Sequence, residues 1–385
     1  MSRPLDILHV TETLAHGGAE QNLLSIIREL PPARFRHHLA WLYDEDLLLE
    51  QFRPHVASLV PIHAGRGVGL AAGAARLARW IRQHRPDVVH AQLIRAEVVA
   101  RVGALVGGRV PVVTTWQNTF YDEQALGEFG NSRVRREVVR WLDRITGKLD
   151  RRFIAVSEHV AAHCSTNLAV ARSRVRVIHN AIDPERCKPV ARDELARKRA
   201  SLGIAASSRI VLAVGRLVPQ KGHSDLLEAI PKVVARMPDV VLLIAGAGPL
   251  RDRLHDSILR AGLGDHIRLL GARTDVPALY QMADAFVFPS RYEGLSVALI
   301  EALANGLPIV CSDIPQNREI GDALPGVSFV RCEDIDGWAE AILAALSITG
   351  SDRSVMTAGR SSVREAFSPK VLARRVGEEL VRAVR

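Results

Sequence analysis

The sequence predicts an α/β protein of two domains, each built on a parallel sheet, and three observations lead to this prediction. The chain has 385 residues, the length of two ordinary domains, and 48% of them are apolar, which is enough for two cores. Short apolar runs typical of buried strands alternate along the chain with longer helical patterns. The stretch from Asp284 to Cys311 joins a strand, a loop, a helix and a second strand, as in a parallel βαβ unit.

The elements of this stretch follow from its residue types. Asp284–Pro289 is a short apolar run that contains Phe286, Val287 and Phe288, and it predicts a buried strand. Ser296 is the predicted N-cap of a helix over Val297–Asn305, and a glycine and a proline end that helix. The next strand begins at Ile309.

Two carboxylates in this stretch are candidates for function. Glu293 lies in the loop before the helix, and Glu301 lies inside a helix that has no polar face. We therefore expect Glu301 to be buried, where a carboxylate needs partners that compensate for lost water. The two hydroxyls of a ribose could donate to it; an arginine or backbone amides are the alternative partners.

The segment PSRYEGLSVALIEALANGLP resembles the signature of the retaining GT-B glycosyltransferases of family 4, in which two glutamates are separated by seven residues. Glu293 and Glu301 fit that spacing. The resemblance implies that the first glutamate contacts the donor sugar and that the second holds the nucleotide ribose. It also implies the GT-B fold, with two Rossmann-like domains facing across a cleft.

The resemblance extends to positions in both halves of the chain that bind the donor in the family. On this sequence the implied donor-binding residues are Gly17, Gly18, Gly248, Gly294, Leu295, Ser296 and Glu301.

Six strands and three helices are predicted in the first half of the chain from apolar runs and helical spacing. The strands are Leu5–Val10, His38–Leu42, Asp87–Ala91, Val110–Thr115, Arg152–Ser157 and Val175–Asn180. The helices are about Gln21–Leu30, Leu70–His84 and Ser132–Arg152.

A glycine pair, Gly17-Gly18, lies between the first strand and the first helix and is followed by Glu20. Such a pair lets a phosphate approach the backbone at a helix N-terminus, although glycines end strands in many proteins without binding anything. The family carries the same GGAE sequence, which faces the donor diphosphate and the acceptor.

Two strand ends carry candidates for positioning the acceptor or the sugar. His90 is expected at the end of the third strand, and Gln117 follows the fourth. The family often has a histidine at the position of Gln117, so this chain departs from its relatives there.

The second half continues the alternation of strands and helices. The predicted strands are Arg209–Val214, Val240–Ala245, His266–Leu270 and Ser328–Arg331, and the helices include Asp275–Ala283, Asp334–Leu346 and Pro369–Val384.

The loop after Arg209–Val214 places Arg216 and Lys221 before a helix N-terminus. A guanidinium and an ammonium suit a diphosphate there, although two solvated surface cations would look the same. The family carries both residues in this loop, where they hold the nucleotide diphosphate.

The domain boundary is predicted from composition. Residues 184–205 are rich in proline, arginine and lysine and are typical of a linker. We therefore expect an N-terminal acceptor domain over residues 1–190 and a C-terminal nucleotide-sugar domain over residues 191–368. The resemblance implies that the terminal helix, 369–384, packs back on the first domain.

The net charge of +9 favours anionic partners, namely phosphorylated substrates, an anionic membrane surface or nucleic acid. Nucleic acid ranks last, because no RNA-binding or zinc-finger motif is present. Four widely spaced cysteines and the lack of a signal-peptide pattern predict a cytoplasmic protein, and no segment is apolar enough to span a membrane.

The predicted helix over Ser132–Arg152 is amphipathic and strongly basic. Within residues 133–152, eight basic residues stand against three acidic ones. This helix could dock on anionic lipid at the inner face of the cell membrane. It could equally be an ordinary surface helix with its apolar stripe on the domain core.

Two Asp-x-Asp triplets, Asp44-Glu45-Asp46 and Asp334-Ile335-Asp336, have a pattern that binds metal in other glycosyltransferases. Such triplets are common by chance, and we interpret both as solvated loop charges. We therefore expect neither a metal nor a cofactor, the nucleoside-diphosphate sugar being a substrate.

The sequence thus predicts a metal-independent hexosyltransferase that moves a sugar from a nucleoside-diphosphate sugar to a lipid-linked or surface-glycan precursor, with retention. Arg216, Lys221 and the helix N-terminus after Ser296 would stabilise the leaving diphosphate, and Glu293 would orient the sugar. Two alternatives stay open: an inactive scaffold that binds nucleotide sugars, favoured by Gln117, and a nucleotide-sugar epimerase of the same fold. The motifs do not distinguish a uridine from a guanosine donor.

Overall fold

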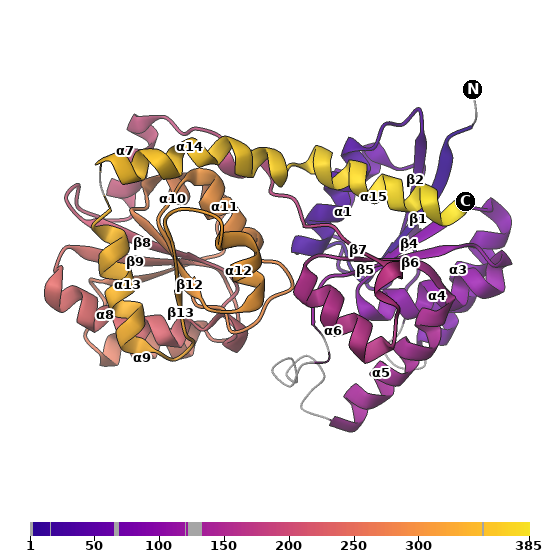
Figure 1. Cartoon of the computed structure of the whole chain (residues 1–385), viewed down its shortest axis with the longest axis horizontal. Coiled ribbons are helices and arrows are strands. Elements are labelled where there is room, and N and C mark those ends of the chain that lie inside the picture. The colour runs from indigo at the N-terminus through magenta and orange to yellow at the C-terminus, as the bar shows by residue number, and fades with distance from the viewer. Residues whose placement is uncertain (1–2, 16, 65–68, 120, 122–132, 349) are drawn as a thin grey trace. The chain divides into compact units, whose positions relative to one another are not determined.

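A computed structural model describes residues 3–15, 17–64, 69–119, 121, 133–348 and 350–385 (Figure 1). The chain divides into two compact units. Unit 1 comprises Met1–Ala181 and Ser368–Arg385, and unit 2 comprises Ile182–Phe367. Unit 2 begins before residue 191, because the short 3-10 helix η5 (Pro184–Cys187) packs on helices α10 and α11.

Unit 1 contains a seven-stranded parallel sheet in the order β3-β2-β1-β4-β5-β6-β7. Its strands are β1 (Leu5–Thr11), β2 (Phe35–Trp41), β3 (Ser58–Pro61), β4 (Val88–Gln92), β5 (Val112–Trp116), β6 (Asp150–Ala155) and β7 (Val175–Val177). Six of these strands were predicted. β3 was missed, because its three half-buried residues and one exposed proline give no recognisable alternation.

Helices cover both faces of this sheet. They are α1 (Gly18–Glu29), α2 (Leu49–Phe52), α3 (Gly69–His84), α4 (Ile94–Gly108), α5 (Arg133–Thr146), α6 (Glu158–Leu168) and α15 (Pro369–Val384). Alternate residues of β1 point to opposite faces, so that Leu8 joins the core under α3 and α4 while Ile7 joins the core under α1 and α15.

The terminal helix α15, yellow in Figure 1, belongs to the core of unit 1. Leu372, Val376 and Leu380 are buried in one cluster with Ile7 and Val113, and α15 packs on α1. The side of the helix that faces the sheet is apolar at helical spacing, which explains why it docks there.

The basic helix of unit 1 is shorter than predicted. It ends at Thr146, not at Arg152, because Asp150–Arg152 pair with β5 as the start of strand β6. The alternative in which its apolar stripe packs on the domain core is also wrong, since Val138 and Trp141 are exposed.

Unit 2 contains a six-stranded parallel sheet in the order β10-β9-β8-β11-β12-β13. Its strands are β8 (Arg209–Val214), β9 (Val240–Ala245), β10 (Ile267–Gly271), β11 (Ala285–Phe288), β12 (Ile309–Ser312) and β13 (Val327–Val330). Its helices are α7 (Arg192–Ser201), α8 (His223–Arg236), α9 (Arg251–Arg260), α10 (Val276–Met282), α11 (Val297–Asn305), α12 (Pro315–Gly321), α13 (Ile335–Leu346) and α14 (Gly350–Ala366).

The predicted linker over residues 184–205 is wrong. Most of it is η5 and α7, and α7 packs on α10. The Lys198 ammonium lies 2.5 Å from an Asp275 carboxylate oxygen at that contact. The composition was typical of a linker, but its charged residues lie on a helix that is attached to unit 2 by ion pairing.

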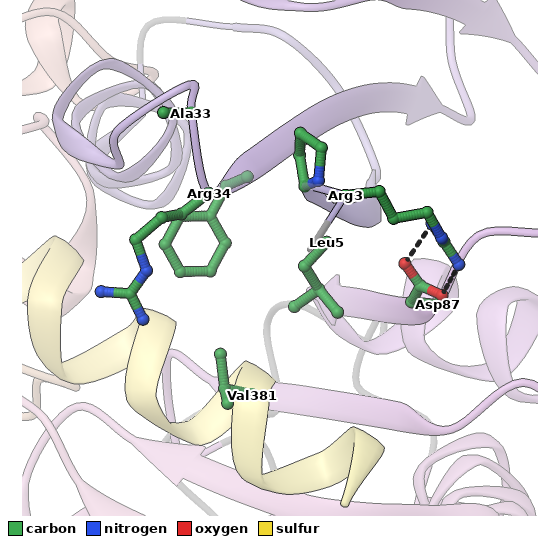
Figure 2. Close-up of a pocket in the computed structure, with 8 residues that line it drawn as sticks. Arg3, Leu5, Ala33, Arg34, Asp87 and Val381 are labelled. Carbon is green, nitrogen blue, oxygen red and sulfur yellow. Dashed lines mark hydrogen bonds and ion pairs between the residues drawn. The ribbon is translucent and has the colours of Figure 1, made fainter. Parts of the chain in front are cut away.

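A cavity of about 350 Å³ lies at the amino ends of β1 and β2 (Figure 2). Leu5 and Phe35, the first residues of those strands, line it together with Val381 of α15, and Arg3 pairs with Asp87 at 2.6 Å beside it. Ligands of parallel sheets bind at the carboxyl ends of the strands, so this cavity is not the candidate site. None of the described helices has both the length and the apolarity that a membrane crossing requires.

Candidate active site

Two loops of unit 2 are fixed to each other at the carboxyl ends of the neighbouring strands β8 and β11. The Arg291 amide donates to the Gln220 carbonyl oxygen at 2.8 Å, and the Gln220 side chain donates to the Tyr292 carbonyl oxygen at 2.8 Å. Gly222 has a φ of +60°, and a Cβ there would lie 2.1 Å from the Pro289 oxygen, so only glycine fits. The loop with the predicted cations is therefore held against the loop with the first glutamate.

Lys221 and Glu293 form an ion pair across these two loops. Lys221 Nζ lies 2.5 Å from Glu293 Oε1, and both side chains are largely but not fully buried. The same ammonium lies 5.0 Å from the ring centroid of Phe288, and Gln316 donates to the Glu293 carbonyl oxygen at 2.7 Å. The residue patterns predict separate roles for the two residues, whereas the structure pairs them, so a phosphate would compete with Glu293 for Lys221.

Arg216 is exposed, and no side-chain partner of its guanidinium is found within the described part of the chain. Its backbone is fixed by His223, the first residue of α8, whose Nε2 lies 3.2 Å from the Arg216 carbonyl oxygen and donates to it. Burial lowers the pKa of His223 to about 4, so its ring is neutral at pH 7. Sequence reasoning missed this histidine, because nothing in its neighbours distinguishes it from a surface residue.

Glu301 is buried in α11, as predicted, and its partners are a tyrosine and a distant arginine. The Tyr280 hydroxyl donates to Glu301 Oε2 at 2.9 Å, and Arg186 Nε lies 4.0 Å from Oε1. Burial raises the pKa of Glu301, although Arg186 and the Tyr280 hydrogen bond act in the opposite direction. An arginine was one of the alternative partners expected for Glu301, and Arg186 is that partner at a long ion-pair distance. The residue pattern did not identify Arg186 or Tyr280 individually.

The first turn of α11 has no side-chain cap. Ser296 occupies the N-cap position, as predicted, but its hydroxyl donates to Asn317 Oδ1 at 3.0 Å instead of accepting from the helix. Asn317 in turn donates to the Ser312 carbonyl oxygen at 2.9 Å. The positive end of the helix therefore lies directly after the buried residues Gly294 and Leu295 without a side chain that satisfies it.

Gly248 lies in the loop after β9, and that loop contacts the loop with Arg216. The Leu217 amide donates to the Ala247 oxygen at 2.9 Å, and the Leu250 amide donates to the Leu217 oxygen at 3.0 Å. The loop with Gly248 is thus fixed to the loop with Arg216, next to the loop that contains Glu293.

In unit 1 the predicted glycine pair begins helix α1. Gly17 is the N-cap and Gly18 is the first helical residue. Glu20 is buried and folds back over Gly17, where a Cβ would lie 2.2 Å from its Oε2. Thr13 donates to Glu20 Oε1 at 3.0 Å, while burial raises the pKa of Glu20. This loop combines a close backbone turn with a carboxyl group.

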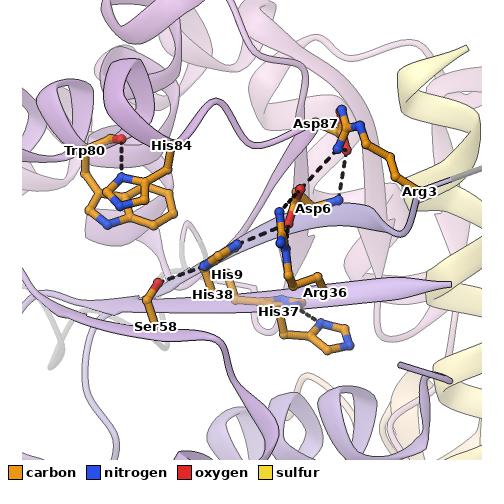
Figure 3. Close-up of polar contacts among 10 residues, drawn as sticks. All are labelled: Arg3, Asp6, His9, Arg36, His37, His38, Ser58, Trp80, His84 and Asp87. Carbon is orange, nitrogen blue, oxygen red and sulfur yellow. Dashed lines mark hydrogen bonds and ion pairs between the residues drawn. The ribbon is translucent and has the colours of Figure 1, made fainter. Parts of the chain in front are cut away.

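His90 lies close to the end of its strand, as expected, since β4 ends at Gln92, one residue beyond the predicted end. The ring of His90 is fully buried within the sheet. Its Nδ1 lies 3.0 Å from Nδ1 of His9, and its Nε2 lies 2.8 Å from the Thr115 hydroxyl oxygen. His9 continues the row to His37 at 3.0 Å, as Figure 3 shows for these two rings. Burial lowers the pKa of His90 to about 4, so it is neutral and turned away from solvent.

Gln117 follows β5, as predicted, and lies in a chain of buried amides. Asn180 donates to Gln117 Oε1 at 3.3 Å, and Gln117 Nε2 donates to Gln92 Oε1 at 3.2 Å. Gln92 then donates to the Ala19 carbonyl oxygen at 3.2 Å, within the GGAE sequence. Gln92 and Asn180 were missed, although each is a polar residue at or after a strand end, the signal that identified Gln117.

The two Asp-x-Asp triplets have other partners. Asp44 lies 2.7 Å from the His63 ring, and Asp336 lies 2.5 Å from the Lys232 ammonium. Asp334 is exposed and caps α13 through a backbone N–H at 2.9 Å. Over the described ranges, no group of three or more His, Cys, Asp and Glu side chains is arranged to hold a metal ion.

Two family models match the chain. "Glycosyltransferase Family 4" matches residues 16–186, and "Glycosyl transferases group 1" matches residues 196–361.

Among curated proteins, the chain is 28% identical over 271 residues to the UDP-Gal:alpha-D-GlcNAc-diphosphoundecaprenol alpha-1,3-galactosyltransferase of Escherichia coli, covering 69% of this chain and 68% of that protein. It is 30% identical over 300 residues to the glycogen synthase of Mycobacterium tuberculosis, covering 76% and 68%. Among solved structures, Anabaena Alr3699/HepE in complex with UDP superposes with a TM-score of 0.82 at 20% identity, covering 98% of this chain and 100% of that one. At that identity the likeness shows a shared fold.

Proposed function

Because this chain belongs to the family 4 glycosyltransferases, which have the GT-B fold, we propose that it transfers a hexose from a nucleoside-diphosphate sugar to an acceptor, with retention. The observation that carries the proposal is the Lys221–Glu293 ion pair beside the uncapped first turn of α11. A cation and a helix N-terminus suit a diphosphate, and an adjacent carboxylate suits the hydroxyls of a sugar.

The donor would be held by groups that unit 2 brings together. Arg216 and Lys221 would bind the diphosphate, with Gly248, Gly294, Leu295 and Ser296 around it. Glu301 would accept hydrogen bonds from the ribose, since its Oε1 has only Arg186 at 4.0 Å among the described residues. Gly17 and Gly18 of unit 1 are further candidates for contact with the donor.

In the proposed reaction the acceptor oxygen attacks the anomeric carbon while the bond from that carbon to the diphosphate oxygen breaks. Negative charge grows on the leaving diphosphate, where Arg216, Lys221 and the first-turn amides of α11 would stabilise it. The acceptor proton would pass to a departing phosphate oxygen on the same face of the sugar. Because side-chain cations and a helix end meet this charge, we propose that no metal ion takes part.

The acceptor is proposed to be a lipid-linked glycan precursor, because the similar Escherichia coli enzyme is named for a diphosphoundecaprenol substrate. Glu20 and Gln117 would position acceptor or sugar hydroxyls. His90 is buried between His9 and Thr115, so any influence on the acceptor would pass through those neighbours. An acceptor carried on a lipid must be met at a bilayer, and we therefore place the protein peripherally on the inner face of the cell membrane.

The test compares two lysines that form equally short ion pairs in unit 2. Lys221→Ala should lower turnover on the order of 10²-fold, the usual cost of losing a preorganised charge stabiliser. Lys232→Ala removes the exposed partner of Asp336, also at 2.5 Å, and should leave turnover within about twofold. Transfer of label from a panel of UDP- and GDP-sugars to a lipid extract measures both variants, with and without EDTA.

Two outcomes would contradict the proposal in different ways. Loss of transfer in EDTA that Mn²⁺ restores would refute the metal-free mechanism. A wild-type protein whose melting temperature rises with a nucleoside diphosphate, yet which transfers no sugar to any acceptor, would favour the inactive scaffold.

A further inference from the structure

Helix α5 turns its apolar residues to solvent. Val134 is 75% exposed and Trp141 is 61% exposed. The exposed apolar residues recur at helical spacing and continue into the following turn: Val134, Val138, Trp141, Leu142, Ile145 and Leu149. They form one stripe along one face of the helix, which points away from unit 1.

The side of α5 that faces the protein is polar. Asp143 is buried and accepts hydrogen bonds from Arg101 and from the Tyr121 hydroxyl. Arg101 is fully buried and also contacts Asp150 at 2.7 Å and Glu97 at 3.3 Å. Rotating α5 to bury its stripe would separate Asp143 from this cation, which is costly for a buried charge. The network therefore fixes the apolar stripe outward.

An exposed apolar face of this size marks a surface that contacts a partner. Val134, Val138 and Trp141 line a hollow of about 650 Å³ on it. These residues lose water only when another apolar phase covers them, and no other part of the described chain does so.

The charges beside the stripe identify the partner. Arg140, Arg144, Lys148 and Arg151 reach solvent around it, and Glu137, the exposed carboxylate of this segment, is paired with Arg140. A second copy of the chain would bring the same cations face to face. An anionic bilayer, in contrast, offers both an apolar interior and negative headgroups, and tryptophan is enriched at the boundary between them.

A groove of about 610 Å³ continues the surface beyond the C-terminal end of α5. Leu149 belongs to both the stripe and the groove, and four cations also line the groove: Arg109, Lys148, Arg151 and Arg174. Its size and charge suit phosphate-bearing headgroups next to acyl chains.

We propose that α5 docks this protein on an anionic bilayer. The docking face consists of the apolar residues Val134, Val138, Trp141, Leu142, Ile145 and Leu149 and the cations Arg140, Arg144, Lys148 and Arg151. The apolar residues enter the boundary between headgroups and acyl chains, and the cations bind lipid phosphates. The proposal concerns the membrane partner of the proposed transferase, but vesicle binding requires neither donor nor acceptor, so the two proposals can fail separately.

The experiment is co-sedimentation of the full chain with vesicles of phosphatidylcholine, alone or mixed with phosphatidylglycerol. Wild type is expected to bind the mixed vesicles and to leave them as salt rises. Arg144→Gln with Lys148→Gln should weaken binding about fivefold for each charge removed. Val138→Ser with Trp141→Ser should weaken it by about tenfold or more, because less apolar area enters the bilayer.

Matched controls lie on α9 of unit 2. Leu259 is as exposed as Trp141, at 60%, and Arg251 and Arg253 are exposed cations. Leu259→Ser and the pair Arg251→Gln with Arg253→Gln should leave vesicle binding within about twofold. Unchanged melting temperatures identify variants that are folded.

Trp141 supplies a second readout that needs no destabilising change. The chain has five tryptophans, and the other four are buried or half-buried. Its emission should shift to the blue on mixed vesicles and be quenched by brominated lipid, and both signals should vanish in Trp141→Phe, which still binds.

Three results would overturn the proposal. One is undiminished binding of the serine double variant. Another is equal binding to both vesicle types, which would remove the role of charge. The third is a wild-type dimer that the serine double variant converts to monomers, with no vesicle binding, since the stripe would then be an interface between copies.

Discussion

Both units bury carboxylates, but in unit 1 three of them share one buried cation, whereas the buried Glu301 of unit 2 has no cation within hydrogen-bond distance among the described residues. In unit 1, Glu97, Asp143 and Asp150 surround the fully buried Arg101. In unit 2, Glu301 has one hydrogen bond from Tyr280, and the nearest cation to its other oxygen is 4.0 Å away.

The difference separates a structural carboxylate from a candidate ligand-binding one. Arg101 donates to three carboxylates and also to Thr114 and Thr146, so it links α4, β5, α5 and β6. Glu301 retains an oxygen that a ligand can still bind. Burial and a raised pKa occur in both places, so neither identifies function without the count of partners.

The largest expected effect is on the structural side of this comparison. Arg101→Met should lower the free energy of unfolding by about 3–5 kcal/mol, because three carboxylates would stay buried without a cation. Urea denaturation measures it. Arg172→Met removes the exposed partner of Glu158 and should change stability by about 1 kcal/mol or less. Equal losses in the two variants would show that the buried cluster is no stronger than a surface pair.

The next effect concerns pH in the same cluster. Burial, together with Asp143, raises the pKa of Asp150 from 3.8 to about 7 against the pull of Arg101. Between these values the folded state holds a proton that the unfolded state has lost, so the free energy of unfolding should fall as pH rises from about 4 to 7.

Asp150→Asn keeps the shape of the side chain and removes this titration. Between about pH 4 and 7 the free energy of unfolding should fall less in this variant than in the wild type. The difference should be on the order of a few kcal/mol, because each pKa unit corresponds to about 1.4 kcal/mol. Urea midpoints at each pH test it, with the exposed Asp256→Asn as control. An unchanged slope in Asp150→Asn would show that Asp150 is ionised throughout.

The ligand-binding side of the comparison is tested by Glu301→Gln. The variant should weaken binding of a nucleoside and of its diphosphate alike by roughly 1.5–3 kcal/mol, the value of hydrogen bonds to a charged acceptor. Calorimetry measures it, and Glu340→Gln, at an exposed pair with Arg236, is the control. Unchanged affinity would show that Glu301 is a structural carboxylate and that the hydrogen bond from Tyr280 is sufficient for it.

The smallest effect is expected at Gln117. Its amide is already hydrogen-bonded to Asn180 and Gln92, so it positions the GGAE loop through Gln92 and Ala19. Gln117→Ala should lower kcat/KM by about tenfold or less, the equivalent of one neutral hydrogen bond. Glu293→Ala should lower it far more. If both variants are equally inactive with the same donor and acceptor, Gln117 takes part in the chemistry itself.

Much of the fold was predictable because parallel strands are buried on both faces and read as apolar runs. The predictions failed in segments whose structure is determined by tertiary contacts. Helix α7 lacks an apolar stripe and is held to α10 by Lys198 and Asp275. His90 was expected to be available to the acceptor, but contacts with His9 and Thr115 on the neighbouring strands bury its ring.

The residues of the candidate site were predictable from the sequence, but the pairs that they form were not. Lys221 and Glu293 each lie in a recognisable loop, but 72 residues separate them, and only the contact of the two loops brings them to 2.5 Å. For the same reason, the sequence could not show whether the apolar stripe of α5 faces the protein or the solvent. Its stripe is visible in the sequence, whereas the buried Arg101–Asp143 contact that turns the stripe outward joins residues 42 positions apart.

The place of α15 in unit 1 has a consequence for synthesis on the ribosome. Residues 1–181 emerge first, but their core lacks Leu372, Val376 and Leu380 until the whole of unit 2 has been made. At about 5–20 residues per second, that interval is roughly ten to forty seconds. During it, α1 and the sheet present an uncovered apolar surface, so the nascent chain depends on chaperones for longer than a protein whose domains are completed in order.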